Sequence, residues 1–160
     1  MTTAFQMAPT AVHRAETDLP FVTFPDGVRM QLLQVDLATG VWVVRSLFPA
    51  GVSVQTHKHT GHVYAFTRSG RWYYRESPEA VNVAGSYLFE PAGSVHTLHA
   101  PPGNEGDTDV CFVIHGAILN LTAEGDVEAV IDAAGVLSSY RALCRSEHAT
   151  SDPPVVLTHD

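Results

Sequence analysis

The stretch Gly51-Val-Ser-Val-Gln-Thr-His-Lys-His59 is followed, further along the chain, by Gly85-Ser-Tyr-Leu-Phe-Glu-Pro-Ala-Gly-Ser-Val-His96. Side chains two residues apart on a β-strand point to the same face, so His57 and His59 can bind one ion together. His96 must then come from another strand that lies alongside. Imidazole nitrogens bind Zn, Fe, Ni and Cu, and three of them leave coordination positions open for a substrate. The two segments therefore predict a three-histidine metal site.

Short strands separated by turns that contain glycine and proline surround these two segments. The run Val41–Phe48 consists mostly of β-branched and aromatic residues, which favour strands, and Pro49-Ala-Gly51 ends it. Further along, apolar residues change to a helical spacing over residues 132–146, with Asp132 as the expected N-cap. About ten short strands and one late helix predict an all-β barrel or sandwich with a single C-terminal helix.

The length of 160 residues favours one domain that is large enough to bury a core. Residues 1–18 are weakly patterned, and we expect an N-terminal arm there. The folded domain is expected to span residues 19–147. The segment 148–160 contains adjacent prolines and polar residues, and we expect it to be a flexible tail.

The composition argues against several classes of partner. The formal net charge is −8 without a basic patch, which argues against binding to nucleic acid and to anionic membrane surfaces. No apolar run approaches the roughly 18–20 residues that cross a bilayer. The two cysteines, Cys111 and Cys144, do not make a disulfide framework, and the N-terminal residues lack a signal-peptide pattern. We therefore expect a cytoplasmic protein.

The spacing of the two opening segments resembles the two motifs of the cupin superfamily. Gly51, His57 and His59, followed by Gly70, match the first motif, and the segment from Gly85 to His96 matches the second. The resemblance implies an all-β single-domain cupin, a jelly-roll β-barrel, with one C-terminal helix. It also implies a homodimer or a higher homo-oligomer, because cupins commonly pair through edge strands.

The first motif departs from the usual cupin pattern at one ligand position. Most cupins carry a glutamate a few residues after the second histidine, and those places hold Val63 and Tyr64 here. The expected site therefore has three histidines and no carboxylate ligand. A bound cation then keeps more positive charge and is a stronger Lewis acid towards an anionic, chelating substrate. This pattern resembles iron(II) dioxygenases that cleave carbon–carbon bonds, such as the acetylacetone-cleaving type.

A closer resemblance is to the 2,4'-dihydroxyacetophenone dioxygenase family. It rests on short matches spread from residue 20 to residue 146, among them His59-Thr-Gly61, Gly85-Ser-Tyr87, Glu90-Pro-Ala-Gly93 and His96-Thr-Leu98. The resemblance implies that dioxygen is inserted between a ketone carbonyl and its hydroxylated neighbour, with two carboxylic acids as products. The expected substrate is a small aromatic ketone or a β-diketone, and the second substrate is dioxygen.

Four further side chains are candidates for the site. Glu90 precedes the turn that leads to the third histidine, where a related three-histidine enzyme carries a glutamate beside the metal, and it can hold an imidazole N–H or a water. Arg75 can pair with Glu90 or receive the anion of the substrate. Tyr64 stands at a position of the absent carboxylate, where its hydroxyl can orient a water. His62 is a possible extra metal ligand.

Other histidines and aromatic residues are weaker candidates. His99 lies three residues after His96, so on a strand it should face the opposite way. The facing of His115 is left open, because a bulge would reverse the alternation. Four aromatic residues can line a pocket for an aromatic ring, although such residues more often fill a plain core: Trp72, Tyr73, Tyr74 and Tyr87.

Three functions remain open from the sequence. The first is a dioxygenase with Fe(II) that cleaves a carbon–carbon bond next to a carbonyl. The second is a lyase or isomerase on the same scaffold with Zn, Ni or Mn, since imidazole ligation accepts several ions. The third is a cupin that binds a metal or a small ligand without turnover.

Overall fold

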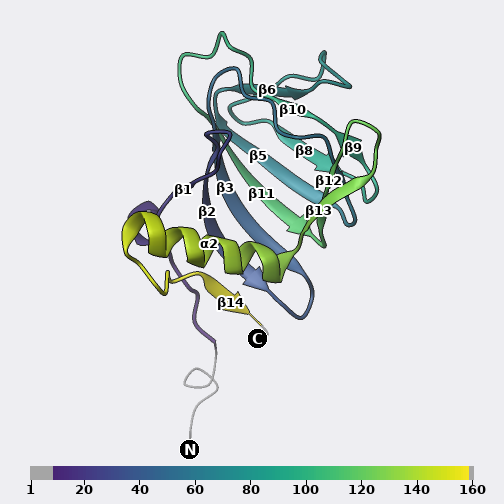
Figure 1. Cartoon of the computed structure of the whole chain (residues 1–160). Helices are drawn as coiled ribbons and strands as arrows, with labels where there is room; N and C mark the ends of the chain where they lie inside the picture. Colours follow the sequence, from purple (N-terminus) through teal and green to yellow (C-terminus); the bar gives the residue numbers. More distant parts are fainter. Residues whose placement is uncertain (1–8, 159–160) are drawn as a thin grey trace, which may run out of the picture.

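The computed structural model describes residues 9–158 and contains one large sheet with two smaller ones (Figure 1). The large sheet has the strand order β1-β2-β3-β11-β5-β8, and β14 pairs with β2. Its strands are antiparallel except for the β14–β2 pair. Their bounds are β1 Val22–Thr23, β2 Arg29–Asp36, β3 Val41–Phe48, β5 Val63–Ser69, β8 Tyr87–Glu90, β11 Thr108–His115 and β14 Val156–Thr158.

Two smaller sheets face the large one and complete the barrel. One has the order β10-β6-β7 and the other β13-β12-β4-β9. Their bounds are β4 His57–His59, β6 Arg71–Tyr74, β7 Asn82–Val83, β9 Val95–His96, β10 Leu98–His99, β12 Ile118–Leu121 and β13 Val127–Ile131. The predicted all-β fold with one C-terminal helix is therefore confirmed.

The core lies between the sheets and follows the alternation of the strands. On β3 every second side chain is buried, including Trp42, Val44 and Phe48. Phe112 on the neighbouring strand β11 stacks edge-on against Phe48, with ring centroids 6.2 Å apart. Burying one large apolar side chain contributes about 1.5–3 kcal/mol to the stability of the fold. The alternating apolar residues therefore determine which face of each strand points into the barrel.

The helix α2 (Ala133–His148) follows β13 and covers one end of the large sheet, where it packs on β1 and β2 (Figure 1). Its predicted N-cap is confirmed, because the Asp132 carboxylate accepts a 2.8 Å hydrogen bond from the Gly135 backbone N–H. The helix ends at Ala149, which adopts the left-handed conformation. Tyr140 is fully buried and its hydroxyl donates to the Pro20 carbonyl, at 2.6 Å. This contact joins the helix to the chain just before β1.

The prediction of a flexible tail over residues 148–160 is wrong for the part that the structure describes. Helix α2 continues to His148, and β14 then runs parallel to β2, with Val156 opposite Gln34 and Thr158 opposite Asp36. Val155 is buried against the core. A strand of three residues that pairs with a distant edge leaves no periodic signal in the local sequence, which explains the error. Residues 159–160 lie outside the described range.

The predicted arm, residues 1–18, lies partly outside the described range, which begins at residue 9. Its described part holds a 3-10 turn, η1 (Glu16–Asp18). The Glu16 carboxylate there accepts a 2.6 Å hydrogen bond from Arg45 on β3. This end of the arm is therefore fastened to the large sheet. Between residues 9 and 158, no helix is long and apolar enough to cross a membrane.

Candidate metal centre

The three predicted ligand histidines lie together at one place in the barrel. His57 and His59 are both buried on β4, and Lys58 between them is exposed, as the alternation of a strand requires. Strand β9 pairs antiparallel with β4 and places His96 directly opposite His57. One ring nitrogen of each histidine lies within 4.8 Å of the other two. Of the residues the structure describes, these three are the only group of histidine, cysteine or acidic side chains with such an arrangement.

The hydrogen bond of His57 fixes which of its nitrogens is free. Nδ1 lies 2.8 Å from the Gln55 backbone carbonyl, which can only accept, so Nδ1 carries the proton. The Nε2 lone pair is then available to a cation, and the carbonyl holds the ring in place, as is usual for metal-binding histidines. The ring centroids of the three histidines lie 4.9 to 5.1 Å apart.

Glu90, at the end of β8, places its carboxylate against two of these histidines. Its Oε2 lies 3.0 Å from His59 Nε2 and 3.5 Å from His96 Nε2, and only 3% of Glu90 is exposed. In the pairing of β5 with β8, Glu90 is directly opposite Val63, one of the positions where the first motif lacks its carboxylate. Glu90 therefore lies beside the three histidines, as expected for it from the sequence, and the group of side chains that could hold an ion still consists of histidines alone.

Unpaired buried atoms indicate that these residues suit a cation. Oε2 of Glu90 and Nε2 of His96 are buried, and neither has a hydrogen-bond partner among the described residues. Leaving a buried carboxylate oxygen unpaired is costly, and a divalent cation among the imidazoles would offset that cost. Imidazole and carboxylate together are a normal ligand set for Zn, Fe, Ni and Mn.

Tyr74 on β6 contacts both Glu90 and His96, and the sequence did not single out this role. Its hydroxyl donates to Glu90 Oε1, and its ring stacks on His96, with centroids 3.8 Å apart and planes inclined by 10°. The sequence placed Tyr74 only among four possible pocket aromatics. Alternation on β6 gives its orientation, because Trp72, two residues earlier, is fully buried on the same face.

Burial and neighbouring charges set the protonation of the centre. Burial lowers the pKa of His57, and it lowers the pKa of His96 to about 4 although Glu90 opposes this shift. Burial alone would raise the pKa of Glu90, but the contacts with His59, His96 and Tyr74 outweigh it and hold that pKa below its ordinary value. Burial and the Glu90 charge raise the pKa of Tyr74, which keeps its hydroxyl proton. At neutral pH, His57 and His96 are therefore neutral, which is the form that can bind a metal ion, and Glu90 beside them is anionic.

The structure places Tyr64 away from the centre. Its neighbours on β5, Val63 and Ala65, are buried towards the interior, so Tyr64 points to the outer face. Its ring packs there near Tyr87 and Phe89, at centroid distances of 6.5 and 5.8 Å. The predicted role of Tyr64 in orienting a water at the metal is therefore wrong, because strand alternation directs Val63 inward instead.

The predicted pairing of Arg75 with Glu90 is not present either. Arg75 is exposed, and its guanidinium donates to Ser53 Oγ at 2.7 Å, while Tyr74 occupies the place beside Glu90. Ser53 Oγ is also 2.7 Å from His99 Nδ1. As the strand parity predicts, His99 faces away from His96 and lies beside Arg75.

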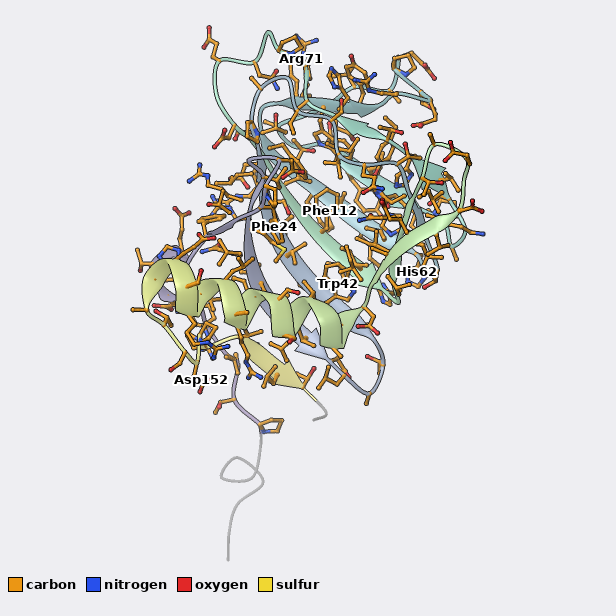
Figure 2. The ribbon with its side chains drawn as sticks, viewed as in Figure 1. Phe24, Trp42, His62, Arg71, Phe112 and Asp152 are labelled. Carbon is orange, nitrogen blue, oxygen red and sulfur yellow. The ribbon has the colours of Figure 1, made fainter. Side chains whose placement is uncertain are left out.

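His62 is not brought to the three histidines. Its ring stacks on His115, with centroids 3.9 Å apart, and both are half-buried. Figure 2 shows His62 at the side of the molecule, away from the residues labelled in its middle. The possible role of His62 as an extra ligand is therefore not supported by its position, and His115 shares its outer location.

An apolar cavity of about 240 Å³ ends on the histidine centre. His57, His59, Tyr74 and Glu90 form its polar end. Apolar residues form most of the remaining wall: Phe24, Met30, Trp42, Val44, Phe48, Val54, Leu98, Phe112, Ile114, Ile118, Ile131 and Val136. Figure 2 shows Phe24, Trp42 and Phe112 gathered in the middle of the molecule, above α2. The helix contributes to the wall, so the C-terminal part of the fold also shapes the cavity.

Of the four aromatic residues predicted to line a pocket, only Tyr74 does so. Trp72 is enclosed in the core, where its indole N–H donates to Thr67 Oγ1 at 2.8 Å. Tyr73 packs near His99 on the other face, and Tyr87 is exposed. The aromatic part of the cavity wall is formed instead by Phe24, Trp42, Phe48 and Phe112. These residues come together only because strands that are distant in the sequence pair with one another.

Solved structures similar to this chain include proteins described as cupins. A cupin-like protein of unknown function from Ralstonia eutropha JMP134 is 30% identical, with 92% of this chain and 96% of that chain covered and a TM-score of 0.80. An RmlC-like cupin from the same organism is 25% identical over 99% and 100% of the two chains, with a TM-score of 0.85. The acetylacetone dioxygenase of Acinetobacter johnsonii is 25% identical over 85% and 93%, with a TM-score of 0.72.

Sequence comparison agrees with the structural likeness. No curated protein matches the chain. The family model described as the ChrR cupin-like domain matches residues 9–119, which include all three histidines, Tyr74 and Glu90. The predicted resemblance to the cupin superfamily is confirmed by this match and by the solved structures. The chain therefore belongs to the ChrR cupin-like domain family.

Proposed function

We propose that this protein is a metal-dependent dioxygenase that cleaves a carbon–carbon bond next to a carbonyl in a hydroxy-aryl ketone or a β-diketone. The observation that carries the proposal is the small apolar cavity that ends on His57, His59 and Glu90, close to His96. The likeness to the acetylacetone dioxygenase of Acinetobacter johnsonii supports it. Fe(II) is the proposed ion, and Zn, Ni or Mn suits the same ligands.

The chain's own residues have distinct tasks in this proposal. His57, His59 and His96 would hold the ion through their ring nitrogens and leave positions open for the substrate. An iron ion held there would supply Lewis acidity and redox chemistry with dioxygen. Glu90 faces the centre as a fixed negative charge, and the Tyr74 hydroxyl holds its other oxygen. The apolar wall excludes water, which strengthens the electrostatic interactions at the polar end.

The reaction for a hydroxymethyl aryl ketone balances without a further oxidant. The ketone Ar–CO–CH2OH and one O2 give Ar–COOH and HCOOH. The bond between the carbonyl carbon and its hydroxylated neighbour breaks, and each product carries one of the two new oxygen atoms. Dioxygen is the four-electron oxidant, and the two carbon atoms of the cleaved bond are oxidised. No external reductant is required.

Oxygen uptake by iron-loaded protein tests the proposal. The protein is purified without oxygen, its metal content is measured, and uptake is followed with a panel of hydroxyacetophenones and β-diketones. We expect one O2 to be consumed per substrate and, for the hydroxyacetophenones, one equivalent of each of the two carboxylic acids to be formed. Stoichiometric zinc with turnover but no oxygen uptake would instead identify a lyase or isomerase. Tight ligand binding with no turnover under any metal would identify a binding protein.

A further inference from the structure

The far wall of the cavity offers no partner for an anion. Among the described residues, no lysine or arginine lines it, and the polar residues away from the histidine end are the serines Ser46 and Ser139. A carboxylate or phosphate placed there would lose its hydration without gaining a cation. Burying such an unpaired charge is strongly unfavourable.

The route from the cavity to solvent is acidic rather than basic. A second hollow shares Phe24, Phe48, Val54, His57, Ile118 and Ile131 with the cavity, and it adds Pro25, Asp26, Val28 and Asn120. Pro25 and Asp26 are exposed and Asn120 is half-buried, so this hollow is where the cavity meets solvent. Among the described residues that line this hollow, Asp26 is the one with a charged side chain at neutral pH, and the whole chain carries a formal net charge of −8. An anionic ligand is therefore opposed at the entrance and at the wall.

The size of the cavity limits the body of the ligand. About 240 Å³ lies below the range of roughly 300–1,000 Å³ that is common for drug-sized ligands. Trp42 and Phe112 are aromatic residues of the wall, and the hydroxyl of Ser46 or Ser139 can form a hydrogen bond with a single neutral hydroxyl on the ligand. The part of the ligand that lies inside this cavity is therefore about the size of one aromatic ring or a short alkyl chain.

We propose that the site selects dicarbonyl or hydroxy-ketone ligands whose body is compact, apolar and uncharged, and that it rejects analogues with a carboxylate or phosphate at the end remote from the carbonyls. This proposal rests on the proposed function in one respect: it assumes that the ligand binds with its carbonyl oxygen atoms at the histidines. The uncharged wall and the acidic entrance determine the specificity, and the metal centre binds the carbonyl end that all such ligands share.

Binding to zinc-loaded protein tests the selection without turnover. The probes are 1-phenyl-1,3-butanedione and the same compound with a carboxylate in the para position of the ring. Trp42 lines the cavity and is one of the two tryptophans in the sequence, so fluorescence quenching reports occupancy, and equilibrium dialysis gives an independent affinity. We expect the neutral compound to bind more tightly by at least about tenfold.

Variants that change the charge at the entrance test whether that charge causes the preference for the neutral probe. Asn120→Lys places a cation where the cavity meets solvent, so the preference for the neutral probe should shrink, whereas the matched variant Asn120→Gln should keep it. Asp26→Asn, on an exposed turn, should shrink the preference by a smaller factor. Circular dichroism confirms that each variant is folded.

The possible outcomes separate this proposal from the proposed function. Equal binding of both probes, or binding of neither, would overturn the selection. An unchanged preference in Asn120→Lys and in Asp26→Asn would overturn the role of charge at the entrance. Selective binding of the neutral probe to zinc-loaded protein, with no oxygen uptake when iron is loaded, would leave the selection standing and refute the dioxygenase.

Discussion

Glu90 shows how one residue can restore a feature that the sequence motif lacks. Directly opposite residues of an antiparallel pair have Cβ atoms about 4.5–5.5 Å apart. Because Glu90 is opposite Val63, its carboxylate reaches the region that a glutamate in the first motif would serve. It comes from another strand, however, and approaches His59 and His96 rather than His57. The negative charge at the centre is therefore retained, with a different orientation.

Tyr74→Phe tests whether the orientation of Glu90 matters. The substitution removes the hydroxyl that donates to Glu90 Oε1 and keeps the ring that stacks on His96. Residues that orient the groups around a metal typically change affinity or activity by about 10–100-fold when they are lost. We expect metal affinity to weaken by about tenfold, measured by competition with a chelator, and kcat to fall more than KM changes.

Tyr73→Phe is the matched control for this prediction. Tyr73 precedes Tyr74 on the same strand but faces His99 on the other side, so metal affinity and kcat should stay at the wild-type values. Equal effects of the two substitutions would mean that Tyr74 acts only through the stability of β6. A metal affinity of Tyr74→Phe that matches wild type would show that Glu90 needs no support from its hydroxyl.

Elements differ in how well the sequence predicts them. The helix could be located because Asp132 offers a local cap and the apolar spacing changes after it. The facing of His57, His59 and His99 followed from alternation along short strands. The contact of Tyr74 with Glu90 joins β6 to β8, which do not pair with each other, and β14 pairs with β2 from more than a hundred residues away. Such contacts depend on the register of distant strands, which a single sequence does not encode locally.

Asp132→Ala tests the contribution of the N-cap to α2. The change leaves the backbone N–H of Gly135 without its partner and should cost about 1 kcal/mol. For a chain of this size that corresponds to a melting temperature lower by about 2–4 °C. Thermal unfolding followed by circular dichroism measures it. Asp152→Ala is the control, since its ion pair with Arg141 is 3.7 Å long and highly exposed, and it should shift the melting temperature by much less.

In the molecule as a whole, the polar centre occupies one end of a large apolar core. The core cluster extends from Leu19 before β1 to Val155 before β14, so both ends of the folded region contribute to it. The histidines lie at one end of the cavity and replace only a small part of the apolar interior. Metal removal should therefore disturb the centre without unfolding the barrel. The predicted homo-oligomer stays a prediction.

Removing the metal tests this separation between core and centre. We expect chelator-treated protein to keep its far-ultraviolet circular dichroism spectrum at 25 °C and to unfold cooperatively. Its melting temperature should be lower, because an ion that binds only the native state adds RT ln(1 + [L]/Kd), about 2.7 kcal/mol at a free concentration of 100 Kd. His96→Ala should melt at the same temperature with and without added metal, whereas His99→Ala, on the other face, should retain the full increase. Loss of the β-sheet spectrum on chelation would show instead that the ion holds the barrel together, as in small domains that fold only around a metal.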